Sequence, residues 1–155
     1  MALEPFQEVL DDHRDHVLRF LVAAAGPDDA DDCFQETFLA ALRAYPRLRP
    51  DSNIRAWLLT IAQRKAIDAH RARTRRPLPV SDPEPAGHAA PPGLDGEAAL
   101  WRAVHTLPER QRAAVLLRYF GDLSHREVGR AMNGSEAAAR RNVHDGLKKL
   151  REALA

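Results

Sequence analysis

Apolar residues recur at three- and four-residue steps on both sides of a proline-rich stretch, and this pattern constrains the fold of the 155-residue chain most strongly. Such a period is typical of amphipathic helices, and no stretch shows the sustained alternation of a strand. Residues 77–96 carry six of the eleven prolines and three of the eight glycines. With little apolar content they are expected to form a flexible linker. The sequence therefore predicts an all-α fold of two small helical modules, residues 1–76 and 97–155, joined by linker 77–96.

The N-terminal module is expected to hold three helices around one core. The first ends at Gly26-Pro27, and the second begins near Asp28 and stops before Pro46. The third runs from about Asn53 to Arg73, with Ser52 or Asn53 as its N-cap. Periodicity predicts these buried positions: Phe6, Val9, Leu10, Val17, Leu18 and Leu21 in the first helix, Phe34, Phe38, Leu39 and Leu42 in the second, and Ile54, Trp57, Leu58, Ile61 and Ala62 in the third. The lone cysteine, Cys33, is expected to pack as a small apolar residue.

The C-terminal module carries several helix start and stop signals. Thr106 and Glu109 have the spacing of a capping box, and so do Ser124 and Glu127. Gly121 is expected to end the helix that follows Glu109. Asn133-Gly134 tolerates a left-handed turn, and a last helix is predicted from about Ser135 to Leu154. A short helix, a tight turn and a longer basic helix together predict a helix-turn-helix.

Charge is strongly segregated along the chain, although the net charge is only +1. Residues 1–40 hold ten acidic and two basic residues, whereas residues 41–76 hold ten basic and two acidic ones. Residues 77–100 contain four acids and no base, and residues 101–155 contain eleven bases against six acids. Separate blocks of opposite sign indicate separate partners, one of them basic and one polyanionic.

Basic side chains gather on the last helix of each module. Arg140, Arg141, Asn142 and His144 lie in the first turns of the predicted recognition helix, the part that enters a major groove. Arginine can chelate a guanine edge and asparagine an adenine edge. In the N-terminal module a run of basic residues accompanies Trp57, a combination suited to a single strand with splayed bases, although the helical stripe places most of the Trp57 ring in the core.

Ordered motifs then resemble a known family. They are Asp31-Asp-Cys-Phe-Gln-Glu-Thr-Phe38, Asn53-Ile-Arg-Ala-Trp-Leu-Leu-Thr-Ile-Ala62, Ala66-Ile-Asp68 with Arg71, Leu107-Pro-Glu-Arg-Gln-Arg112 and Leu123-Ser-His-Arg-Glu-Val128. In order and spacing they closely resemble bacterial RNA polymerase sigma factors of the extracytoplasmic-function (ECF) group. The resemblance covers nearly the whole chain outside the linker.

The resemblance implies roles for particular residues. An acidic helix docks on the β′ clamp helices of RNA polymerase core, a helix and its preceding loop engage the −10 promoter element and the melted strand, and a last helix reads the −35 element as duplex. The matching residues here are Asp31, Asp32, Gln35 and Glu36 for the clamp, Arg49, Ser52, Asn53, Trp57, Arg64, Lys65 and Arg71 for −10, and Ser135, Arg140, Arg141, Asn142 and His144 for −35. The partners implied are the polymerase core, including its β subunit, promoter DNA and an anti-sigma factor.

The last helix departs from the family pattern. Ala137-Ala-Ala139 stands where Gly-Thr-Val is frequent, and Asn142, Asp145 and Gly146 follow. The −35 sequence that is read is therefore expected to differ.

Other classes of protein share some of these sequence features. His13 and His16 could share a helix face as metal ligands of an enzyme, but a solvated acidic helix explains them, and no third ligand at fixed spacing, phosphate loop or nucleophile motif accompanies them. A stand-alone helix-turn-helix regulator that does not bind core polymerase would leave the acidic second helix and the basic third helix without a task. A sigma mimic that is poor at initiation is a third alternative, which the altered last helix keeps open. We expect no catalytic residue, no metal and no cofactor. No membrane span or secretory signal is recognised, so a cytoplasmic protein is expected.

Overall fold

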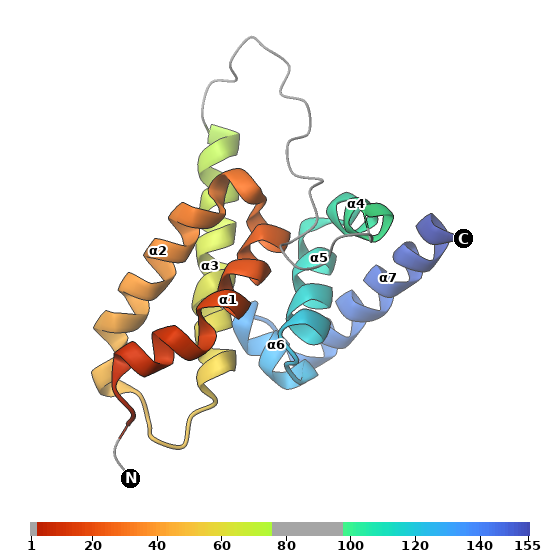
Figure 1. Cartoon of the computed structure of the whole chain (residues 1–155). Helices are drawn as coiled ribbons and strands as arrows, with labels where there is room; N and C mark the ends of the chain where they lie inside the picture. The colour runs from red at the N-terminus through yellow and green to blue at the C-terminus, as the bar shows by residue number, and fades with distance from the viewer. Residues whose placement is uncertain (1–2, 76–97) are drawn as a thin grey trace.

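The computed structural model describes residues 3–75 and 98–155, and every regular element in these ranges is helical (Figure 1). The predicted linker 77–96 lies outside the described residues. The N-terminal half contains α1 (Phe6–Ala25), α2 (Pro27–Ala44), the short 3-10 helix η1 (Tyr45–Arg47) and α3 (Ile54–Arg75). The C-terminal half contains α4 (Ala98–Thr106), α5 (Glu109–Val115), the π-helical segment η2 (Leu116–Phe120), α6 (His125–Ala131) and α7 (Glu136–Leu154). The predicted all-α class is confirmed.

The N-terminal helices α1, α2 and α3 pack against one another around large, fully buried side chains. Gly26 turns the chain between α1 and α2 with a φ of 90°, a conformation that costs glycine least, and Pro27 then occupies the first turn of α2. At the start of α3 the Asn53 Oδ1 accepts the amide N–H of Ala56 at 3.1 Å. Of the two expected caps, Asn53 therefore makes the bond.

The expected burial of Leu39 and Leu42 is wrong, because their side chains are 52% and 51% exposed. The buried face of α2 instead carries mostly small residues, namely Ala30, Cys33, Thr37 and Ala41, together with Phe38. Small side chains let α2 approach its neighbours closely, and the Thr37 hydroxyl is satisfied because it donates to the Cys33 carbonyl at 2.7 Å. The face of α2 that carries the small residues, and not the face that carries the two leucines, therefore packs against the core.

The two expected capping boxes of the C-terminal half have different outcomes. At α6 the box is confirmed: the Ser124 hydroxyl accepts the Glu127 amide N–H at 3.1 Å, and Glu127 Oε1 accepts the Ser124 amide N–H at 3.0 Å. The box at Thr106 is wrong. The Thr106 hydroxyl donates back to the Ala103 carbonyl at 2.6 Å, and α5 begins after Pro108 without a side-chain cap. Thr106 is the last residue of α4 and Pro108 takes the N-cap position of α5, so Thr106 is not placed to cap α5.

The predicted helix-turn-helix is present as α6, a tight turn and α7. Asn133 adopts the expected left-handed conformation with a φ of 55°. Gly129 of α6 allows the close approach of the two helices, since a Cβ there would lie 2.9 Å from the Ser135 carbonyl oxygen. The turn and this glycine together set the α7 start beside α6.

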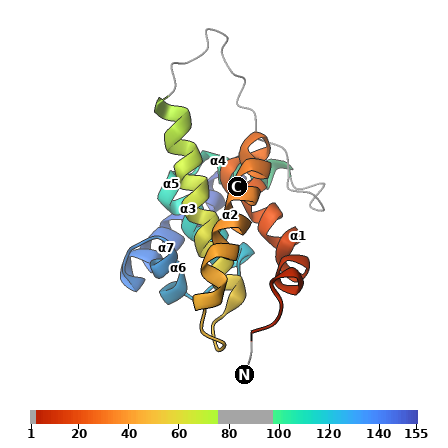
Figure 2. The same cartoon turned by 90° about the vertical axis from the view of Figure 1, so that its left-hand side faces the viewer.

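The two halves pack side by side, with α6 against α3 and η2 against α1 (Figures 1 and 2). One continuous group of buried apolar residues runs through both halves. The outer face of α2 and the outer face of α7 consequently lie on opposite sides of the molecule (Figure 1).

Candidate functional site

The acidic residues proposed to contact a partner form an exposed face on α2. Asp31, Asp32, Gln35 and Glu36 are all exposed. Asp32 and Glu36 are one helical turn apart and are therefore neighbours on the surface. They lie outside the buried stripe of α2, so their charges face solvent and remain available to a basic partner.

The same acidic face continues onto α3. A groove between α2 and α3 is lined by Asp29, Asp32, Glu36 and Asp68, with Arg73 at its edge. Arg73 Nε pairs with Asp29 Oδ2 at 2.7 Å, and Arg73 Nη2 lies 3.9 Å from Asp28 Oδ2. The chain thus neutralises the first turn of α2 with its own arginine and leaves Asp32 and Glu36 without such a partner in the described residues. Asp68 was missed as a contributor because it lies on another helix.

Cys33 lies at the base of this groove and is 3% exposed. Burial, followed by the nearby carboxylates of Asp29, Glu36, Asp32 and Asp68, raises the pKa of its thiol to about 11. Its Sγ contacts the Lys65 carbonyl at 3.7 Å. The expectation that Cys33 packs as a small apolar residue is confirmed.

Leu39 and Leu42 extend the acidic face with apolar surface. Counting from Asp32, the positions Glu36 and Leu39 follow at helical spacing along one side of α2, and Leu42 continues that line. Two exposed leucines beside carboxylates form a mixed surface typical of a protein interface rather than of solvated helix. Sequence reasoning missed this contribution because it assigned both leucines to the core.

The basic face of α3 brings together most of the residues proposed for the −10 element. At about 100° per residue, Asn53, Trp57, Arg64 and Arg71 fall within about 40° of one another around the helix axis. Arg64 and Arg71 are exposed, and Arg49 and Ser52 lie in the loop just before α3. Lys65 is half-buried and turned about 100° away from Arg64, on the side that packs toward α2.

Trp57 is half-buried, with one part of its surface against the core. Its ring centroid lies 6.2 Å from that of Tyr45, which in turn packs on Phe6 at 5.3 Å. The Tyr45 hydroxyl donates to the Glu4 carbonyl. The tryptophan is thus held by aromatic neighbours, while its remaining surface shares the basic face of α3.

The outer face of α7 carries most of the residues proposed for the −35 element. Ser135 caps the helix, its hydroxyl accepting the Ala138 amide N–H at 3.0 Å. Arg140, Arg141 and His144 are exposed and lie opposite the buried stripe of Ala139, Val143 and Gly146. Asn142 is half-buried and lies about 100° from Arg141, toward the packed side. The structure therefore groups two arginines and His144, and sets Asn142 at the edge of that group.

His125 of α6 lies beside α7, and its surroundings favour the neutral form of the ring. Burial and the neighbouring guanidinium groups of Arg140 and Arg118 lower its pKa, although Glu136 opposes them. Glu136 lies 3.9 Å from Arg140 Nη2 and holds that side chain near the helix start. The basic residues of the helix-turn-helix therefore gather on one outer surface.

His13 and His16 both lie on α1, beside Arg55. Burial and the Arg55 charge lower the pKa of each ring, with Asp12 and Glu4 acting in the opposite direction on His13. No cluster of three potential metal ligands occurs in residues 3–75 and 98–155.

Models of two families match the chain. The model of sigma-70 region 2 matches residues 9–76, and that of sigma-70 region 4 matches residues 97–150. The first match contains the acidic face of α2 and the basic face of α3, and the second contains the helix-turn-helix.

Curated relatives agree with these matches. The chain is 32% identical over 158 residues to the RNA polymerase sigma factor CarQ of Myxococcus xanthus, covering 99% of this chain and 91% of CarQ. It is 30% identical over 167 residues to the ECF RNA polymerase sigma factor SigE of Mycolicibacterium smegmatis, covering 99% of this chain and 63% of SigE. The chain therefore spans nearly all of one relative and somewhat under two thirds of the other.

Solved structures share the fold. The sigma factor RpoE, in a complex with the anti-sigma factor NepR from Bartonella quintana, superposes with a TM-score of 0.77 at 22% identity, covering 96% of both chains. CnrH, in a complex with the cytosolic domain of CnrY, superposes with a TM-score of 0.66 at 23% identity, covering 96% of this chain and 86% of CnrH.

The acidic and basic faces, together with the two family matches, define a transcription initiation factor built from two helical parts. The chain belongs to the RNA polymerase sigma factors of the sigma-70 family, in the ECF group. Its function is promoter-specific initiation of transcription with RNA polymerase and promoter DNA. A stand-alone helix-turn-helix regulator is not favoured, because it would not account for the region 2 match. Among the described helices none is both long and apolar enough to cross a membrane.

Proposed function

We propose that the two outer faces of the N-terminal module divide the work of initiation, with α2 holding RNA polymerase core and α3 holding the opened −10 element. The observation that carries this proposal is the opposite charge of two faces fixed on one small core: exposed carboxylates on α2, and Arg64 and Arg71 on α3. A rigid module of this kind can bridge a basic protein surface and a nucleic-acid strand at the same time.

The polymerase contact is assigned to Asp31, Asp32, Gln35 and Glu36, with Leu39 and Leu42 as its apolar continuation. Carboxylates steer a basic partner and fix its orientation, whereas exposed leucines supply area that can be removed from water. The clamp helices of the β′ subunit are the proposed partner of this surface.

The −10 contact is assigned to the face that carries Asn53, Trp57, Arg64 and Arg71, with Arg49 and Ser52 in the adjoining loop. Guanidinium groups can follow phosphates, and the free part of the Trp57 ring can stack on a base. Lys65 is proposed as a neighbouring phosphate contact, reached around the side of α3.

The −35 contact is assigned to α7. Arg140, Arg141 and His144 face outward, where an inserted helix would meet base edges and phosphates, and Ser135 is placed at the helix start where a phosphate can approach. Asn142 is proposed as a contact at the margin of this surface.

Several further roles rest on the same assignment. The initiation factor is proposed to have no catalytic activity of its own and to work in the cytoplasm, where bacterial polymerase acts. Both structural relatives above are described in complexes with a second protein, one of them named as an anti-sigma factor. An anti-sigma factor is therefore proposed as an inhibitory partner of this chain.

The polymerase assignment is tested by charge reversal with a matched control. Asp32→Lys with Glu36→Lys is expected to weaken binding to core polymerase by at least about tenfold, because two attractions become repulsions. Asp11→Lys with Asp12→Lys makes the same change of net charge on α1 and is expected to leave binding near the original level. Affinity for core polymerase is measured by fluorescence anisotropy, and run-off transcription on genomic fragments is scored in parallel. Equal losses for both pairs would refute a specific contact on α2.

A further inference from the structure

The contact between the two halves runs along the face of α3 that is proposed to bind the −10 strand. Asn53 Nδ2 donates to Glu127 Oε2 at 3.3 Å, and Arg64 Nη2 donates to Asn133 Oδ1 at 3.5 Å. Both acceptors belong to the helix-turn-helix, one in α6 and one in its turn. The Asn53 amide and one edge of the Arg64 guanidinium thus face oxygen acceptors, the groups that a nucleic-acid strand would otherwise present to them.

Apolar contacts support this polar edge. A Cβ on Gly121 would lie 2.7 Å from Leu59 Cδ1 and equally close to the Leu117 carbonyl oxygen, so the glycine allows the end of η2 to reach α3. The rings of His16 in α1 and Phe120 in η2 lie 5.5 Å apart. The two halves therefore meet through complementary surfaces and not only through two long hydrogen bonds.

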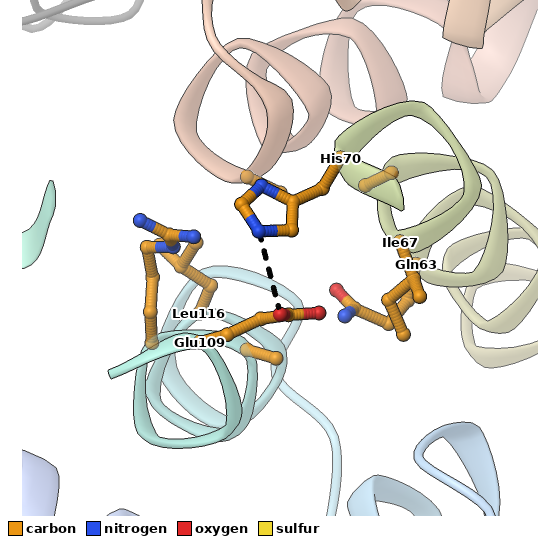
Figure 3. Close-up of a pocket in the computed structure, with 9 residues that line it drawn as sticks. Gln63, Ile67, His70, Glu109 and Leu116 are labelled. Atoms are coloured by element: carbon orange, nitrogen blue, oxygen red, sulfur yellow. Dashed lines mark ion pairs between the residues drawn. The ribbon is translucent and has the colours of Figure 1, made fainter. Parts of the chain in front are cut away.

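The same contact buries polar atoms that have no hydrogen-bond partner. Gln63 is 3% exposed, and its Oε1 has no hydrogen-bond partner among the described residues; the same holds for His16 Nε2. Gln63 lines a small cavity between α3 and α5, where His70 Nε2 lies 3.8 Å from Glu109 Oε2 across the gap (Figure 3). Separation of the halves would return these atoms to water, which lowers the free-energy cost of opening.

The recognition helix is not covered in this arrangement. Arg140, Arg141 and His144 remain exposed. The contact is therefore selective: it occupies part of the proposed strand-binding face and leaves the proposed duplex-reading face free.

We propose that the helix-turn-helix acts as an internal inhibitor of strand binding, with Glu127 and Asn133 holding the donors of α3 until the two halves separate. This inference rests on the proposed function of α3. In the free chain, the apparent affinity for single-stranded DNA is reduced by the fraction of molecules that are closed. Binding to polymerase or to duplex DNA through the uncovered surfaces can proceed before that separation.

An opened variant tests the proposal in the full-length chain. Glu127→Ala with Asn133→Gly removes both acceptors, and glycine keeps the left-handed conformation of residue 133 accessible. Ser124→Ala is the control for the lost α6 cap, and Glu127→Gln keeps one acceptor oxygen for the Ser124 N–H while it presents an NH2 donor to Asn53. Far-UV circular dichroism verifies that each variant folds.

Two readouts are taken on each variant. Dyes on Glu8→Cys and Glu152→Cys report the distance between the halves by single-molecule energy transfer, because the native Cys33 is too buried to label. A fluorescein-labelled pool of random single-stranded 20-mers reports strand affinity at low salt. The opened variant is expected to show a longer and broader distance distribution and roughly threefold to tenfold tighter strand binding, with Ser124→Ala near the original chain and Glu127→Gln between the two.

Each other outcome overturns the proposal. A broad distribution in the original chain would mean that the closed arrangement is not populated, and an unchanged distribution in the opened variant would mean that Glu127 and Asn133 do not hold it. Longer distances without tighter strand binding would show that closure does not inhibit. Adding Trp57→Ala and Arg71→Ala to the opened variant separates the two hypotheses: unchanged strand affinity there would remove α3 as the strand-binding surface, and the proposed function would fail with it.

Discussion

The two basic helices of this sigma factor are placed very differently. The outer face of α7 is fully available to solvent, with Arg140, Arg141 and His144 opposite a regular buried stripe. The basic face of α3 borders the other half of the chain, where Asn53 and Arg64 are hydrogen-bonded to it. One proposed DNA surface is ready for a partner, and the other is partly occupied.

This difference follows the form of DNA that each helix is proposed to meet. Duplex DNA exists before the protein arrives, so a duplex-reading helix gains by being exposed. A separated strand exists only after opening, so its binding surface can be held by internal contacts until then. The comparison teaches that two surfaces of similar charge can be distinguished by their internal partners more clearly than by composition.

The largest expected effect concerns the buried sides of the two helices. Leu58 of α3 is 0% exposed, whereas Leu150 of α7 is 8% exposed and lies near the helix end. Leu58→Ala should lower the free energy of unfolding by about 3 to 5 kcal/mol, and Leu150→Ala by about 2 kcal/mol, because the site at a helix end can relax. Urea denaturation followed by circular dichroism measures both. Equal losses of unfolding free energy would contradict the conclusion that Leu58 is more deeply buried than Leu150.

Paired removal of arginines on the outer faces is expected to have the next largest effect. Arg140→Ala with Arg141→Ala should flatten the salt dependence of duplex binding by about 1.8 in log–log slope, since each phosphate contact contributes about 0.9. Arg64→Ala with Arg71→Ala should flatten that of single-strand binding by about 1.4, because each contact contributes about 0.7 there. Titrations between low and moderate salt measure the slopes. If either pair changed both slopes alike, the division of labour between α3 and α7 would be lost.

The helix caps are expected to give a smaller and matched effect. Ser135→Ala on α7 and Asn53→Ala on α3 each remove a side-chain acceptor of a helix N–H. Each should cost about 1 kcal/mol of stability. Asn53→Ala should in addition release the contact to Glu127, so only this variant is expected to lengthen the distance between the halves. A longer distance in Ser135→Ala would argue that the caps act on closure indirectly.

The smallest expected effect is a pH dependence where α1 meets η2. Burial and the charges of Arg55, His13 and Arg19 lower the pKa of His16 below its ordinary value of 6.5. In the window between the lowered pKa and 6.5 the unfolded chain binds more protons than the folded chain, so stability falls as pH drops through 6.5 and is fully present above it. His16→Gln should make the stability less dependent on pH between 7.5 and about 5.5 in thermal melts. A slope identical to that of the original chain would exclude His16 as a source.

Local signals in the sequence predicted much of the fold. The capping box of Ser124 and Glu127, the turn at Asn133 and the stop at Gly26-Pro27 each depend on residues a few positions apart, and each is found in the structure. The capping box at Thr106 is wrong because Thr106 is still part of α4 and Pro108 takes the N-cap position of α5. The predicted burial of Leu39 and Leu42 is wrong because a pattern of hydrophobic residues does not show where small residues allow helices to pack closely.

The candidate site was less accessible to sequence reasoning. Residue types identified an acidic and a basic helix, but they could not show that Lys65 and Asn142 turn away from their neighbours, because spacing must be combined with the observed buried face. The contacts of Glu127 with Asn53 and of Asn133 with Arg64 join residues that are 74 and 69 positions apart. No periodic pattern encodes such pairs, since they arise only when two separate helical units pack.

Glu127 uses its two oxygens for different purposes, one for the backbone N–H of Ser124 and one for the side chain of Asn53. Aspartate would be too short to serve both, and an aliphatic residue would serve neither. Tolerance to substitution at this position should consequently be narrow, because even glutamine keeps only one acceptor oxygen and would turn an NH2 donor toward one of the two N–H groups. The same carboxylate therefore stabilises the start of α6 and the packing of α6 on α3. A mutation at Glu127 would weaken both at once.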